Sequence, residues 1–213
     1  MDERTCGIIL RTRPLTETSL IVHWLTPDLG RLATVAKGAR RLKSPFLGKL
    51  DLFHLAEFSF RRSRRSDLHA LHEADVREFH PALRRDLGYL QQASYFTKLI
   101  EQTTEIGTPI PEIYDLLAGA LKILPERAPR CLTVYAFEMK LLLELGVQPD
   151  LANCPLRSAS KAVLGQISSA DWRAISQVTL DSDADAEIGR FLHRHMVYHL
   201  HKVPAGRSAA APP

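Results

Sequence analysis

Long apolar runs and paired cysteines are both missing from this sequence. Although 45% of its 213 residues are hydrophobic, no stretch approaches the ~18 consecutive apolar residues that a membrane-spanning helix requires. Its beginning lacks the basic and then apolar segment that directs secretion. The three cysteines, Cys6, Cys131 and Cys154, are too few and too far apart for a disulfide framework. We therefore expect no membrane span and a reducing, cytoplasmic compartment.

The common catalytic and ion-binding motifs are also absent or incomplete. Gly48-Lys49 lacks the spacing and the following hydroxyl residue of a phosphate-binding loop, and no G-x-S-x-G nucleophile motif occurs. The segment 181–185, DSDAD, begins like a calcium loop, but Ala186 replaces the required glycine and Leu192 the bidentate glutamate. We therefore expect no cofactor and no metal ion, and we interpret these acids as the start of a helix.

Four histidines crowd the last predicted helix, and two of them have the spacing of metal ligands. His195 and His199 are four residues apart, so they share a helix face, which suits two zinc ligands. No glutamate stands between them, and nothing in the sequence supplies the third ligand of a catalytic zinc. A metal-dependent enzyme on the C-terminal helices stays open as an alternative. Solvent-facing or hydrogen-bonded histidines at a helix end are the favoured interpretation.

Positive charge is concentrated in one stretch of the chain. The whole sequence has a net charge of +4, from 28 lysines and arginines against 24 aspartates and glutamates. Residues 31–65 contain ten of the basic residues and two of the acidic ones, so this stretch carries +8 and the remainder −4. The basic residues form two clusters, 37–43 and 61–65. Such a block predicts a polyanionic partner, and the alternative is a solvated face without a ligand.

The first 78 residues have the pattern of short strands. Alternating apolar residues and turn residues mark five runs, at 6–11, 19–25, 31–36, 50–60 and 67–76. After His80-Pro81 the apolar spacing becomes three and four residues, which is helical. We therefore predict an α+β protein with an N-terminal five-stranded OB-type β-barrel over residues 1–78, followed by an all-helical C-terminal domain over residues 79–202. The Pro- and Ala-rich residues 203–213 are expected to be disordered.

The basic stretch from Lys37 to Ser44 suits a nucleic acid without any catalysis. Arginine and lysine side chains match phosphate oxygens, and glycine and serine keep the loop small. Phe46 lies in the same loop, so we expect it to stack on an unpaired base. The predicted DNA-binding residues are Lys37, Arg40, Arg41, Lys43, Arg31, Arg61, Arg62, Arg64, Arg65 and Phe46. A general RNA-binding OB module has the same chemistry and stays open as a second alternative.

Several segments carry distinctive motifs, namely Gly7–Val22, Thr26–Arg31, the VAKGARRLKS segment 35–44, and helical segments at 83–87 and 137–142. Together they resemble the RecO family of bacterial recombination mediators, and the segment 35–44 is the most specific of them. The resemblance covers most of residues 5–150. It implies an OB fold followed by a helical domain, binding of single- and double-stranded DNA, and annealing of complementary strands. It maps the family's DNA-contacting residues onto Lys37, Arg40, Arg41 and Lys43, whereas the arginines of 61–65 rest on charge alone.

The resemblance also implies partners. It implies work with RecR to load RecA onto DNA covered by single-strand-binding protein, whose acidic C-terminal tail is a candidate ligand of the helical domain. Arg127, Arg130 and Lys140 are the basic residues predicted to bind this tail. The four-cysteine zinc module of many family members is reduced here to Cys154, so we predict no tetrahedral zinc site. Binding to DNA implies a nucleoid-associated protein in the cytoplasm.

Overall fold

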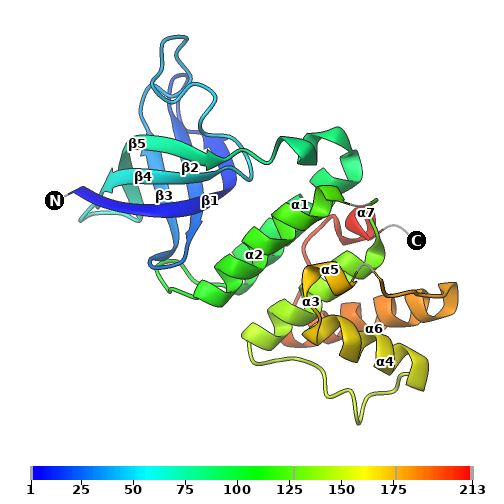
Figure 1. The fold of residues 1–213 in the computed structure, drawn as a ribbon. Coiled ribbons are helices and arrows are strands. Elements are labelled where there is room, and N and C mark those ends of the chain that lie inside the picture. The colour runs from blue at the N-terminus through cyan, green and yellow to red at the C-terminus, as the bar shows by residue number, and fades with distance from the viewer. Residues whose placement is uncertain (1, 127, 176, 212–213) are drawn as a thin grey trace. The chain divides into compact units, whose positions relative to one another are not determined.

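The computed structural model describes residues 2–126, 128–175 and 177–211, which form two compact units (Figure 1). The barrel unit consists of Met1–Pro81 and Thr104–Asp115, and the helical unit of Ala82–Thr103 and Leu116–Pro213. The sequence pattern placed a single boundary between residues 78 and 79. It did not predict that residues 104–115 belong with the barrel.

Five strands close into a barrel in the order β1-β2-β3-β5-β4. They are β1 (Asp2–Pro14), β2 (Leu20–Thr26), β3 (Gly30–Ala36), β4 (Leu55–Arg61) and β5 (Leu68–Glu78). Neighbouring strands are antiparallel except β3 and β5, which are parallel. The first half of β1 pairs with β4 and its second half with β2, so this one long strand closes the barrel. The predicted fold class is confirmed.

Aromatic side chains fill the interior of the barrel. The rings of Trp24 and Phe58 stack with centroids 4.0 Å apart, and both side chains are almost fully buried. The indole Nε1 of Trp24 donates a hydrogen bond to Thr34 Oγ1 at 2.8 Å, so its polar atom is satisfied inside the core. The apolar residues that alternate along these strands therefore point into the barrel, as the sequence pattern predicted.

The fourth strand begins later than its apolar pattern predicts. Residues 50–54 precede it as turn and irregular backbone, and Phe53 has a φ of 67°, which lies outside the β region. Phe53 nevertheless donates its backbone N–H to Ile9 O at 2.9 Å, and its side chain is buried. The predicted face consists of the even-numbered residues from Leu50 to Phe60, whereas the buried Phe53 is out of phase with them. The apolar alternation of residues 50–54 therefore did not arise from a strand.

The helical unit is built around α3. Its elements and those leading into it are the short 3-10 helices Pro81–Arg85 and Leu124–Glu126, α1 (Leu87–Thr103), α2 (Pro111–Ile123), α3 (Cys131–Glu144), α4 (Ser158–Ser169), α5 (Trp172–Ile175), α6 (Ser182–Leu200) and α7 (Arg207–Ala210). The α3 side chain of Phe137 stacks on Phe96 of α1 with ring centroids 3.9 Å apart. Asp181 accepts a hydrogen bond from the Ala184 N–H at 2.7 Å and so caps α6, as the interpretation of these acids as a helix start expects.

Among the described residues, no helix has the length and apolarity needed to cross a membrane.

The C-terminal segment is ordered through residue 211, which corrects the prediction of a disordered tail. The guanidinium of Arg207 makes two hydrogen bonds to the carboxylate of Glu138, at 2.7 and 2.8 Å, and Glu138 is fully buried. Burial alone would lower the pKa of Arg207, but the bonds to Glu138 raise it above its ordinary value. Ala210 is also buried, and its carbonyl accepts from Gln92 at 2.9 Å. Composition cannot reveal that one arginine satisfies a distant buried acid; residues 212–213 lie outside the described residues.

We expect Arg207→Ala to lower the free energy of unfolding by about 3–5 kcal/mol, because it leaves the carboxylate of Glu138 buried without its cation. The double variant Glu138→Gln/Arg207→Met removes both charges and should recover most of this loss. Urea unfolding followed by circular dichroism measures both variants. Equal losses in the two would contradict an effect of the unpaired charge.

Candidate nucleic-acid interface

The most specific part of the sequence forms a projecting loop. Residues 37–49, here called the basic loop, leave the end of β3 and extend away from the barrel, in the light blue region at the top of Figure 1. Successive turns stiffen it, since Arg41 N–H bonds Gly38 O and Ser44 N–H bonds Arg41 O, both at 3.0 Å. Gly38 has a φ of 71°, a conformation that favours glycine at this turn.

Phe46 anchors the basic loop rather than contacting a ligand. Its side chain is 6% exposed and belongs to the buried cluster of the barrel, together with Ala39 from the same loop. The expectation that Phe46 stacks on a base is therefore wrong. Burying the phenyl ring in this cluster removes apolar surface from water, which stabilises the loop against the barrel.

Four predicted cations of the basic loop are exposed together. Lys37, Arg40, Arg41 and Lys43 all face solvent. The guanidinium of Arg40 donates to Thr16 O at 3.1 Å, and its backbone N–H to Thr18 O at 3.0 Å, which ties the loop to the β1–β2 turn. The side chains of Lys37, Arg41 and Lys43 form no hydrogen bond or ion pair with any residue that the structure describes. Their charge is available to phosphate oxygens.

The second predicted cluster, residues 61–65, lies at the other end of β1. Arg61 pairs with Asp2 at 3.1 Å, and Arg62 makes two hydrogen bonds to Glu3, both 2.8 Å long. The bonds from Arg62 hold the pKa of Glu3 below its ordinary value. Since Thr16, the contact of Arg40, follows the opposite end of the same strand, the two clusters do not converge on one place. Arg64 and Arg65 are exposed and have no ion pair within the described residues.

Arg31 has a structural role in the barrel unit. Its Nε donates to Thr104 Oγ1 at 2.8 Å, its terminal nitrogen donates to the Thr104 carbonyl, and its own carbonyl accepts from Gly107 N–H at 2.8 Å. These bonds hold residues 104–107 against β3. Two of its guanidinium nitrogens already serve this segment, and the expectation that Arg31 contacts DNA stays a prediction.

Two arginines that sequence reasoning did not select lie on the outer face of β1. Arg11 pairs with His23 and Arg13 with Ile21 in the β1–β2 ladder, and β1 ends close to the basic loop. The R-T-R spacing at 11–13 was the available signal, since residues two apart on a strand share a face. Arg13 is exposed, and it adds a cation on the strand that leads to the turn contacted by Arg40.

His23 lies on the same face of the barrel, close to these arginines. Its Nε2 is buried and has no hydrogen-bond partner among the described residues. Burial lowers the pKa of His23 to about 4, with further contributions from the charges of Arg11, Arg13 and Arg31. The imidazole is therefore neutral at neutral pH.

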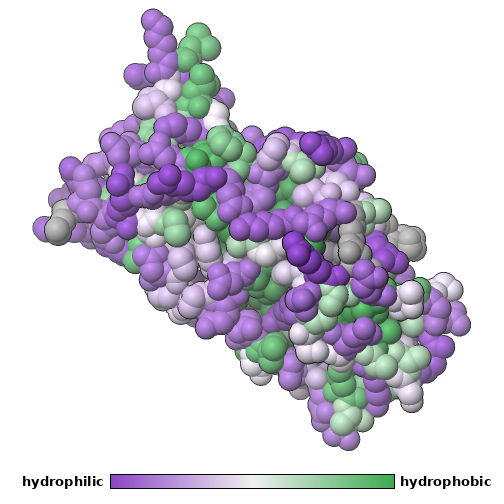
Figure 2. Space-filling view, in the orientation of Figure 1, coloured by the Kyte–Doolittle hydropathy of each residue, from purple (hydrophilic) through white to green (hydrophobic). Residues whose placement is uncertain are grey.

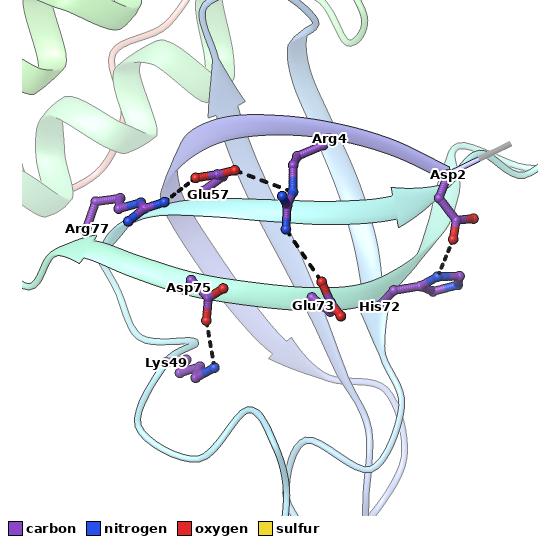
Figure 3. Close-up of polar contacts among 8 residues, drawn as sticks. All are labelled: Asp2, Arg4, Lys49, Glu57, His72, Glu73, Asp75 and Arg77. Carbon is purple, nitrogen blue, oxygen red and sulfur yellow. Dashed lines mark hydrogen bonds and ion pairs between the residues drawn. The ribbon is translucent and has the colours of Figure 1, made fainter.

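The face formed by β1, β4 and β5 carries alternating charges instead (Figure 3). Glu57 lies between Arg4, at 3.4 Å, and Arg77. Arg4 also reaches Glu73 at 3.6 Å, and Lys49 pairs with Asp75 at 3.0 Å. Such a mixed surface repels a polyanion as much as it attracts one, so the basic loop is the better phosphate-binding surface.

The three residues of the helical unit predicted to bind the acidic tail differ in their exposure and in their contacts. Arg127 lies outside the described residues, and Arg130 is exposed immediately before α3. The ammonium of Lys140 donates to the carbonyls of Ser168 and Ala170, at 3.2 and 2.7 Å. Burial lowers its pKa. Lys140 therefore satisfies carbonyl groups at the C-terminal end of α4, and its role in tail binding stays a prediction.

The histidine pair of α6 does not assemble a metal centre in the part of the chain that the structure describes. The rings of His195 and His199 lie 4.4 Å apart, but His195 Nε2 lies 2.7 Å from the carbonyl oxygen of Val147. No group of three or more histidine, cysteine or acidic side chains gathers among the described residues. Cys154 approaches Leu151 O at 3.5 Å in a short turn that Asp150 stabilises.

Comparisons with known proteins agree for both units. Residues 1–80 match the family model "Recombination protein O N terminal" and residues 84–160 match "Recombination protein O C terminal". The chain is 31% identical over 175 residues to the DNA repair protein RecO of Alkaliphilus metalliredigens, covering 82% of this chain and 68% of the relative. The RecO proteins of Rhodopirellula baltica and Exiguobacterium sibiricum are 34% and 30% identical, over 70% and 76% of this chain. The matches span 55% and 64% of those two relatives.

The titration of His23 predicts a pH-dependent stability. An unfolded histidine has a pKa of about 6.5, whereas folding lowers the pKa of His23 to about 4, so the unfolded chain binds more protons between these values. The free energy of unfolding should therefore fall as the pH decreases from ~6.5 to ~4, and this contribution should be complete above that window. His23→Gln should flatten this part of the curve. Urea unfolding at several pH values measures it, and identical pH slopes for the variant and the wild type would contradict the assignment.

Proposed function

The chain belongs to the RecO family of DNA repair proteins, and from this premise we propose that it binds single- and double-stranded DNA and anneals complementary strands without catalytic chemistry. The observation that carries the proposal is the projecting basic loop. It presents Lys37, Arg40, Arg41 and Lys43 on a stiff segment, and three of these side chains have no partner among the described residues.

The proposed mechanism is electrostatic. Two DNA strands repel one another through their phosphates, and a protein that neutralises some of these phosphates lowers that repulsion. The cations displaced from the DNA then make the affinity fall with salt, with a slope on a log–log plot of about −0.7 for each phosphate neutralised on a single strand. No general acid, base or metal is needed for this task.

The proposal includes the protein partners implied for the family. We propose that the chain works with RecR to load RecA onto DNA covered by single-strand-binding protein, at the nucleoid of the cytoplasm. We also propose that the acidic tail of single-strand-binding protein binds the helical unit. The support is a groove of about 710 Å³ beside α6, whose lining includes Arg190, Arg194 and Arg207 against one acid, Asp185. This groove, with the exposed Arg130, supports tail binding better than Lys140 does.

An RNA-binding OB module is the second candidate, because phosphate contacts do not distinguish the two nucleic acids. Only contacts to the ribose 2′-hydroxyl do so. Competition between RNA and DNA of one sequence for the wild-type protein separates these functions. A clear preference for RNA would favour the second candidate.

We expect the triple variant Lys37→Glu/Arg40→Glu/Arg41→Glu to lose at least about 100-fold in affinity for single-stranded DNA at low salt, and to show a shallower salt dependence. Fluorescence anisotropy of a labelled oligonucleotide at several salt concentrations measures both quantities. The three side chains are exposed, so the barrel should stay folded.

A matched control reverses three exposed cations of the helical unit that lie outside the proposed groove, Arg85, Lys98 and Lys202, and changes the net charge equally. This control should retain most of the affinity, because its charges lie outside the basic loop. If both variants lose affinity to the same degree, net charge alone governs binding and the proposed site is wrong.

A further inference from the structure

The tip of the basic loop carries an apolar side chain in full contact with water. Leu42 is 94% exposed, more than any other large apolar residue that the structure describes. Leu47, on the same loop, is 68% exposed. Figure 2 shows this projection with hydrophobic and hydrophilic residues side by side. An isolated exposed leucine needs no explanation on most surfaces, but this one lies between the cations Arg41 and Lys43.

The exposure of Leu42 is imposed by the construction of the loop. Phe46 and Ala39 are buried in the barrel core, and Lys49 pairs with Asp75 at 3.0 Å. Leu42 lies within the second of the two turns, at 38–41 and 41–44, and its side chain remains 94% exposed. The loop thus buries Phe46, which we had expected to face a ligand, and exposes Leu42.

The neighbouring charges determine what this leucine meets. Phosphates bound by Arg41 and Lys43 hold a strand against the loop tip, and the bases of that strand lie within one side-chain length of its backbone. The faces of the bases are the apolar surface of a nucleic acid. A leucine gains by leaving water for such a surface, and apolar wedges of this kind part neighbouring bases in other DNA-binding proteins.

We propose that Leu42 inserts between neighbouring bases of the DNA strand held by Arg41 and Lys43, and that it unstacks them. This inference rests on the proposed DNA-binding function and adds to it a contact between the protein and the bases. The residue that makes this contact is Leu42, in place of the buried Phe46. An unstacked base presents its pairing edge to a second strand, which is the step that annealing requires.

An anionic membrane is the other surface that an apolar tip among cations suits. Membrane binding grows with the apolar area that is buried, and this loop offers two leucines only. The DNA strand is therefore the favoured occupant, and vesicles form one arm of the test.

The experiment uses the full chain and a single-stranded oligonucleotide that contains 2-aminopurine, whose fluorescence rises when the base is unstacked. At saturating protein the wild type should raise this fluorescence. Leu42→Ala should abolish most of the rise and weaken binding about tenfold, while its salt slope stays that of the wild type because no charge changes. Leu42→Phe should preserve the rise. The control is Leu87→Ala in the helical unit, where Leu87 is as exposed as Leu47 is in the basic loop. This control should behave as the wild type.

The outcomes separate the two proposals. If Leu42→Ala retains the full fluorescence change while the triple charge reversal abolishes binding, the wedge is wrong and the DNA-binding function stands. If the wild type binds no DNA at low salt, both fail. If Leu42→Ala loses binding to phosphatidylglycerol vesicles but leaves the DNA signal unchanged, a membrane is the ligand and the wedge is overturned.

Discussion

The burial of Phe46 and Ala39 in the barrel core is the constraint on which the basic loop depends. A loop with this many cations repels itself, and conformational entropy favours an open ensemble. Two apolar anchors offset this cost, because each leaves water for a cluster that already contains Trp24 and Phe58. The anchors also fix which side chains stay outside. The electrostatic surface of the protein is therefore a consequence of its hydrophobic core.

At the other end of β1, the closure of the barrel neutralises positive charge instead of exposing it. Pairing of β1 with β4 brings Asp2 and Glu3 to Arg61 and Arg62, which are about sixty residues away along the chain. The positive block of residues 31–65 therefore contains both cations with an acidic partner, such as Arg61 and Arg62, and cations without an ion pair among the described residues, such as Arg41. Exposed ion pairs contribute little stability, but they reduce the net charge that an approaching phosphate meets. The sum of charges over a sequence segment therefore overestimates the positive charge of the surface that the segment forms.

The sequence pattern was sufficient for the barrel, its closure and the helical region, because alternation and helical spacing are local properties of the chain. It was insufficient wherever a side chain has a distant partner. Nothing near Arg31 indicates Thr104, and nothing near Arg207 indicates Glu138. Phe46 was misplaced because a loop residue can fold back into a core without leaving a periodic signal. The R-T-R signal at 11–13 was present, but its meaning required the position of β1 beside the basic loop.

The two proposed kinds of contact, cations with phosphates and a leucine with base faces, together predict DNA binding without sequence preference. Phosphate contacts carry no sequence information, and the faces of the bases, unlike their edges, are similar for all four. A leucine that contacts base faces therefore adds affinity without adding selectivity. Hydrogen-bonding side chains at the same tip would hold particular bases and compete with the incoming strand for their pairing edges. A loop whose exposed atoms are cationic or apolar leaves those edges free, which is the requirement that strand annealing sets for the protein surface.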